Sequence, residues 1–82
     1  MMKAHVYVTL KRTVLDPQGQ TISNALRKLG FAGVEDTRQG KYFVLSLADS
    51  LNEGDAKKLV ERISAEVLTN PVIEEFSYKL EG

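Results

Sequence analysis

The stretch LTNPVIEEF, Leu68 to Phe76, decides how the C-terminal half of the chain folds. Proline has no backbone N–H and pushes the residue before it towards an extended conformation, so a helix that reaches this stretch must end by Asn70. Proline also cannot donate to a β-ladder, which places Pro71 at the first residue of a strand or on an edge strand. The stretch therefore predicts a sharp corner between a helix and the last strand.

The residues before this corner have the pattern of an amphipathic helix from about Glu53 to Leu68, with Asn52 as its candidate N-cap. Its apolar side chains recur at helical spacing. They are Ala56, Leu59, Val60, Ile63 and Val67. After the corner, Val72, Phe76, Tyr78 and Leu80 share one parity of the last strand, and Glu74 is the exception on that side.

The N-terminal half begins with a strand, because apolar and polar residues alternate from Ala4 to Leu10. Asp16 is a candidate N-cap, and Pro17 suits the first position of the helix that follows. We expect this helix to pack on the sheet through a stripe made of Ile22, Ala25, Leu26 and Leu29. Gly30 is expected to end it in the left-handed conformation of a Schellman motif.

The middle of the chain has the pattern of a hairpin, with a strand over Val34 to Arg38, a turn at Gln39-Gly40 and a second strand over Lys41 to Leu47. The element order strand, helix, strand, strand, helix, strand is typical of the ferredoxin-like βαββαβ arrangement. We therefore expect a single α+β domain over residues 1–82, with two helices on one face of an antiparallel sheet.

The other face of this sheet is predicted to be too apolar and aromatic for a plain solvated surface. Its residues are His5, Tyr7, Thr9, Tyr42, Val44 and Ile73. We expect it to serve oligomerisation, and the alternative of scattered surface aromatics on a monomer stays open.

Composition excludes several classes of protein. Eleven Lys and Arg balance eleven Asp and Glu, so the chain lacks the basic surplus of a general nucleic-acid binder. It has no cysteine, hence no disulfide and no thiolate nucleophile. No stretch is apolar enough for a membrane span or a secretory signal, so we expect a cytoplasmic protein.

No catalytic, cofactor-binding or metal-binding constellation is predicted. His5 is the only histidine, and Glu74 and Glu75 are neighbours on a strand, so they point to opposite faces. The stretch from Arg38 to Leu47 resembles an RNA-recognition strand, but Phe43 lacks an aromatic partner on its own face. Two classes remain: a subunit of an assembly, or a regulatory domain that binds a small ligand and dimerises through its sheet.

Four separated motifs resemble the signature of the PurS family. They are VLDPQG at Val14 to Gly19, LGF at Leu29 to Phe31, R-x-G-K at Arg38 to Lys41 and NPVIE at Asn70 to Glu74. The family supplies the small subunit of phosphoribosylformylglycinamidine synthase in purine biosynthesis. The resemblance implies a non-catalytic subunit that forms homodimers or higher homo-oligomers. It also implies two partners: a large synthetase subunit, which binds ATP and Mg, and a glutaminase subunit that releases ammonia from glutamine.

The same motifs supply six candidates for partner contact or loop structuring, and no catalytic residue. They are Asp16, Gln18, Arg38, Lys41, Asn70 and Glu74. Local roles stay open for several of them: Asp16 as a helix cap, Asn70 as a helix-end group, and Lys41 as a solvated turn charge. Glu74 is either a solvated or partly buried charge near the corner, or a tether of the loop that accepts backbone or Arg hydrogen bonds.

Overall fold

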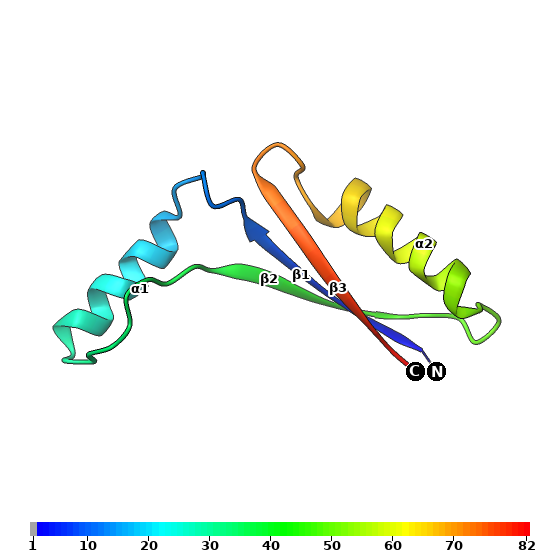
Figure 1. The fold of residues 1–82 in the computed structure, drawn as a ribbon, viewed down its shortest axis with the longest axis horizontal. Coiled ribbons are helices and arrows are strands. Elements are labelled where there is room, and N and C mark those ends of the chain that lie inside the picture. Colours follow the sequence, from blue (N-terminus) through cyan, green and yellow to red (C-terminus); the bar gives the residue numbers. More distant parts are fainter. Residues whose placement is uncertain (1) are drawn as a thin grey trace.

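The computed structural model describes residues 2–82 as an α+β fold built on three antiparallel strands (Figure 1). The elements in chain order are β1 (Lys3–Leu10), α1 (Pro17–Lys28), β2 (Gly40–Ser46), α2 (Glu53–Ile63), the π-helical turn η1 (Ser64–Leu68) and β3 (Glu74–Glu81). The central strand is β1, and it pairs antiparallel with β2 on one side and β3 on the other. The predicted α+β class and antiparallel sheet are confirmed.

The core lies between α2 and one face of the sheet. Every second residue of β1 is fully buried there, namely Ala4, Val6 and Val8, and they pack with Ala56 and Val60 of α2. Half-buried side chains surround this centre: Phe43 and Leu45 from β2, and Phe76, Tyr78 and Leu80 from β3. The period-two pattern in the sequence therefore identified the core sides of the three strands, and Ala56 and Val60 are buried as the helical pattern predicted. The predicted burial of Leu59 and Val67 is wrong, since they keep 40% and 74% of their surface exposed. The π-helical turn η1 departs from the α-helical period, and Leu68 packs against the core instead of Val67.

The position of α1 differs from the prediction. In Figure 1, α1 projects from the end of the sheet, whereas α2 lies along one face of it. The predicted packing of the α1 stripe on the sheet is wrong, since Leu29 keeps 73% of its surface exposed and Ile22 is exposed as well. Only one of the two helices covers the sheet.

The predicted strand from Val34 to Arg38 is also absent, so the sheet has three strands and no hairpin precedes β2. The reason is visible in the hydrogen bonds around this segment. The Gln39 N–H donates to the carboxylate of Asp16, and the Arg38 guanidinium donates to carbonyls of the loop after β1. The residues that lead into β2 are thus bonded to the start of α1 rather than to another strand.

Local signals at the helix ends are confirmed. Gly30 has a φ of 84°, and the N–H groups of Gly30 and Phe31 donate to the carbonyls of Arg27 and Leu26, which is a Schellman ending. The second helical segment ends at Leu68, as the following Asn-Pro requires.

Among residues 2–82, no helix has the length and apolarity that a membrane crossing needs.

The Asn-Pro corner differs in one detail, because β3 begins at Glu74 and not at Pro71. The N–H groups of Ile73 and Glu74 donate to the Asn70 carbonyl at 3.2 and 2.7 Å, which closes a turn over residues 70–74. The peptide bond before Pro71 is trans. The corner is therefore a hydrogen-bonded turn in which the chain reverses before it pairs.

Candidate functional site

The six candidate residues gather where β1 ends and where α1, β2 and β3 begin. We call this region the joint and define it by Asp16, Gln18, Arg38, Lys41, Asn70 and Glu74. A shallow hollow of about 190 Å³ lies there. Four of the six residues line it: Asp16, Gln18, Lys41 and Glu74. Segments that are far apart in the sequence therefore meet at one end of the sheet.

Asp16 joins the start of α1 to the segment that returns from it. Its Oδ1 accepts from the Gly19 N–H at 2.9 Å, as an N-cap does, and its Oδ2 accepts from the Gln39 N–H at 2.8 Å. The hydrogen bond from Gln39 is the main reason that the pKa of the Asp16 carboxyl lies below its usual value. The hydrogen bond from Gly19 and the charge of Arg38 lower this pKa further. Only 6% of Asp16 is exposed, so its carboxylate is buried within the joint, where it accepts hydrogen bonds from the chain.

Arg38 holds the loop between β1 and α1. Its Nη2 lies 3.0 Å from the carbonyl oxygens of both Lys11 and Val14, and 3.5 Å from that of Leu10. A guanidinium that donates to carbonyl groups keeps its charge while it fixes backbone. Arg38 therefore braces the loop that leads from the sheet into α1.

Glu74 holds the Asn-Pro corner closed. Its Oε1 accepts from the Asn70 N–H at 2.8 Å, and its Oε2 lies 3.5 Å from the Nζ of Lys41 on β2. The Asn70 hydrogen bond is the main cause of a lowered pKa for Glu74, and the Lys41 charge contributes. This tether explains why a glutamate stands on the otherwise apolar side of β3.

Two glycines in the joint permit close backbone approaches that sequence reasoning missed. A Cβ on Gly19 would lie 2.2 Å from the Thr37 carbonyl oxygen, and a Cβ on Gly40 would lie 2.5 Å from that of Val8. Glycine inside the first turn of a helix lowers helix stability, so its presence there could have indicated a close backbone contact. The glycines let the return segment pass directly beside α1 and β1.

Gln18 differs from the other members of the joint. Its side chain lines the hollow but makes no hydrogen bond to any of residues 2–82. Its amide carries both donor and acceptor groups, and it is exposed. Among the six candidates it is therefore the residue whose polar group is least committed to holding the chain together.

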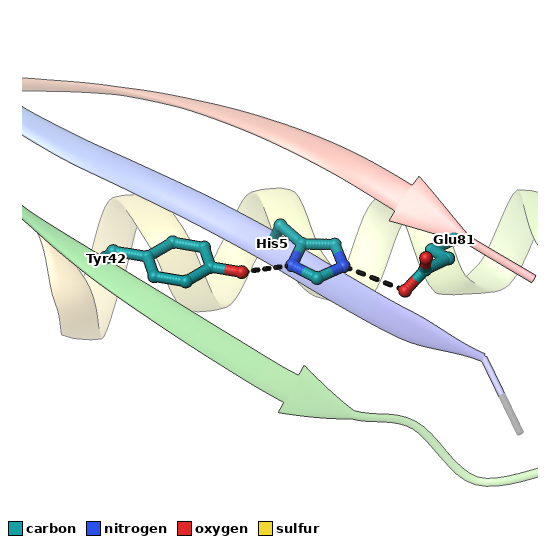
Figure 2. Close-up of polar contacts among 3 residues, drawn as sticks. All are labelled: His5, Tyr42 and Glu81. Atoms are coloured by element: carbon teal, nitrogen blue, oxygen red, sulfur yellow. Dashed lines mark hydrogen bonds and ion pairs between the residues drawn. The ribbon is translucent and has the colours of Figure 1, made fainter.

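The open face of the sheet, opposite α2, carries a row of connected side chains across all three strands (Figure 2). The His5 Nε2 lies 3.1 Å from the Glu81 carboxylate on β3, and its Nδ1 lies 2.5 Å from the Tyr42 hydroxyl on β2. Because an ionised carboxylate only accepts, the His5 Nε2–H donates to Glu81. The contact with His5 lowers the pKa of Glu81.

The rings on this open face are arranged as a flat plate. The His5 and Tyr42 rings are within 6° of parallel, and the Tyr7 ring stacks beside Tyr42 at a centroid distance of 5.2 Å. Tyr7, Tyr42 and Val44 remain largely exposed. Sequence reasoning placed these residues on one face but did not find the His5 contacts, which depend on the register of three strands.

The two regions differ in their chemistry. Most polar atoms of the joint hold backbone groups, and the open face presents aromatic and aliphatic surface. No three His, Cys, Asp or Glu side chains among residues 2–82 are grouped as a metal site. Fold and site together define a small α+β protein with one sheet face left uncovered by its own chain.

Comparison with known proteins gives this class a family. The profile of PurS, described as phosphoribosylformylglycinamidine (FGAM) synthase, matches residues 3–82. The chain belongs to the PurS family, and the predicted membership is confirmed. It is 41% identical over 81 residues to the phosphoribosylformylglycinamidine synthase subunit PurS of Bacillus subtilis, covering 99% of this chain and 94% of that one.

Two solved structures extend the likeness to the fold. PurS of Methanocaldococcus jannaschii is described as one of the subunits of formylglycinamide ribonucleotide amidotransferase in the purine biosynthetic pathway. It superposes with a TM-score of 0.86 at 38% identity, covering 99% of this chain and 96% of that one. A chain in the structure of PurLQS from Thermotoga maritima superposes with a TM-score of 0.76 at 25% identity, covering 99% of both chains.

Proposed function

We propose that this chain is the small, non-catalytic subunit of a formylglycinamidine ribonucleotide synthase complex. It joins an ATP-dependent synthetase subunit to a glutaminase subunit, so that ammonia from glutamine converts formylglycinamide ribonucleotide to formylglycinamidine ribonucleotide. The observation that carries the proposal is the family match over residues 3–82, together with the likeness to a chain of the PurLQS structure. ATP and Mg are bound by the synthetase subunit, and the complex works in the cytoplasm.

The proposal includes self-association through the open sheet face. Exposed aromatic and aliphatic side chains gather there around Tyr7, Tyr42 and Val44, and a surface of this kind favours burial against protein. The chain has a formal net charge of zero, which offers little repulsion between copies. The subunit therefore acts as a homo-oligomer with further surfaces for its two partners.

The complex itself is tested by reconstitution with the cognate synthetase and glutaminase. We expect glutamine-dependent formation of formylglycinamidine ribonucleotide to require this chain, and ammonia-dependent formation to proceed without it. If neither reaction responds and no complex forms, the bridging role is refuted, and a regulatory domain that binds a small ligand becomes the better explanation.

The joint is proposed to support contact with these partners, and Gln18 provides a clean probe of it. Because its side chain makes no internal hydrogen bond, Gln18→Ala should leave the fold intact. Loss of one intermolecular hydrogen bond should weaken binding of the partner subunits by about 2- to 10-fold. Gln20→Ala is the matched control, since Gln20 is also exposed on α1 but lies outside the hollow. Equal binding by both variants would place the contact elsewhere.

A further inference from the structure

A second hollow, of about 310 Å³, lies beside the joint at the same end of the sheet. It shares Thr9 and Leu10 with the hollow of the joint, so the two are neighbours. Binding sites for small molecules have volumes of about 300–1,000 Å³, and this hollow lies at the lower end of that range. We call it the charged hollow and define it by its lining residues, which are Thr9, Leu10, Arg12, Asp36, Arg38 and Glu75.

The floor of the charged hollow follows from the register of the three strands. Thr9 of β1 lies opposite Gly40 of β2 and Glu75 of β3. Residues that lie opposite each other in an antiparallel sheet point to the same face, and for Thr9 this is the face turned away from α2. A Cβ on Gly40 would lie 2.7 Å from the Thr9 Cγ2. The glycine therefore leaves the β2 side of Thr9 open, while Glu75 stands on its β3 side.

The two arginines of the charged hollow keep donors that the chain does not use. Arg12 makes no hydrogen bond or ion pair with any of residues 2–82. Arg38 braces the loop after β1 through Nη2 alone, so its Nε and Nη1 donors remain uncommitted. A guanidinium with free donors binds a carboxylate through two parallel hydrogen bonds.

Two carboxylates line the same hollow. Glu75 has no partner among residues 2–82, and Asp36 uses only Oδ1, which accepts from the Thr37 N–H at 2.9 Å. No ion pair within the described chain joins these carboxylates to the two arginines. The four formal charges sum to zero, so a plain anion would be repelled by the carboxylates and a plain cation by the arginines. A small ligand that carries one charge of each sign satisfies both pairs.

We propose that the charged hollow binds a free α-amino acid as its zwitterion, with Arg12 holding the carboxylate and Glu75 holding the ammonium group. Arg38 and Asp36 add a second charge of each sign. A longer ligand side chain has room in the neighbouring hollow of the joint, where the Gln18 amide has no partner. The choice of occupant rests on the proposed function, because a glutaminase consumes glutamine and releases glutamate.

Binding is tested on the isotope-labelled chain by following its backbone amide signals in NMR spectra as ligands are added. The free ligands are L-glutamine, L-glutamate and L-alanine. N-acetyl-L-alanine lacks the ammonium group, L-alaninamide lacks the carboxylate, and inorganic phosphate is a plain anion. We expect the free amino acids to shift the amides of Thr9, Arg12 and Glu75, and to bind about 10-fold or more tightly than the three other ligands. The free amino acid that binds most tightly identifies the occupant.

Two variants each remove one charged partner of the ligand. Arg12→Ala and Glu75→Gln should keep the wild-type spectrum outside the hollow, because neither side chain has a partner within residues 2–82. Loss of a charged hydrogen bond should weaken amino-acid binding by about 10- to 100-fold in each. Arg27→Ala is the matched control, since Arg27 is exposed on α1 and lies outside the hollow, and it should bind as the unchanged chain does.

The outcomes separate this inference from the bridging role. Binding that both variants leave unchanged would overturn it, and so would shifts that phosphate alone produces. Complex formation that Arg12→Ala abolishes, with no amino acid bound by the unchanged chain, would assign the hollow to a partner subunit instead. A complex that reconstitutes without any amino-acid binding to this chain refutes the charged hollow alone. Binding without reconstitution supports the hollow and refutes the bridging role.

Discussion

Replacing Gly19 by alanine tests whether the joint fixes the direction of α1. The new Cβ would lie 2.2 Å from the Thr37 carbonyl oxygen, whereas real Cβ atoms essentially never approach closer than 3.0 Å. The return segment would therefore have to move by at least 0.8 Å, the difference between these distances. A movement of that size along the bond from Gln39 to Asp16, now 2.8 Å, would stretch it to about 3.6 Å, too long for a hydrogen bond.

Overpacking of this kind costs about 1–3 kcal/mol, and the usual gain from alanine over glycine in a helix offsets about 0.5–1 kcal/mol of it. We expect Gly19→Ala to lower the free energy of unfolding by about 1–2 kcal/mol and the Tm by roughly 5–15 °C. Gly54→Ala is the control, because its Cβ meets only the Asn52 side chain, at 3.4 Å, and should be neutral or slightly stabilising. Urea and thermal unfolding at one protomer concentration measure both variants. A Gly19→Ala protein as stable as the Gly54→Ala protein would refute the close approach.

Two further predictions concern the core and the carboxylates of the joint. Val60→Ala should lower the free energy of unfolding by about 2 kcal/mol, since it removes two methyl groups from a fully buried site, whereas Val67→Ala on the exposed side should change it little; urea midpoints compare them. The pKa values of Asp16 and Glu74 are lowered in the folded chain, so their contribution is complete above the unfolded values of 3.8 and 4.5 and is lost as the pH falls through the folded ones. Stability should therefore decrease below about pH 4.5, and less steeply in Asp16→Asn; equal slopes in urea unfolding from pH 7 to pH 3 would contradict this.

Local chemistry made the helix ends predictable from sequence. The cap at Asp16 and the left-handed ending at Gly30 depend on groups within a few residues of each other, and so does the end of the second helical segment before Asn70-Pro71. Alternating periodicity likewise identified the core sides of the strands, and helical periodicity found Ala56 and Val60 on the buried side of α2, because burial follows directly from which way a side chain points. It failed at Val67, where the π-helical turn η1 departs from the α-helical period.

The errors arose where distant segments decide the outcome. The segment from Val34 to Arg38 looks like a strand, yet its end is held by contacts from Arg38 and Gln39 to residues 23 to 28 positions earlier. The packing of α1 on the sheet was predicted from its apolar stripe. That prediction assumed that the stripe contacts the sheet of the same chain. The row from Tyr42 through His5 to Glu81 spans three strands, so it required their register.

Most of the motifs that resemble PurS contribute residues that fix the direction of α1 relative to the sheet. Three of the four contribute residues to the joint, where Asp16, Arg38 and Glu74 hold backbone groups of other segments. A helix packed on its own sheet would be oriented by that packing, but α1 has no such support within the chain. Polar clamps and close glycine contacts must therefore fix its direction. Because that direction decides where the exposed apolar residues Ile22 and Leu29 of α1 lie relative to the sheet, loosening the joint should impair the proposed assembly even when the core between α2 and the sheet stays intact.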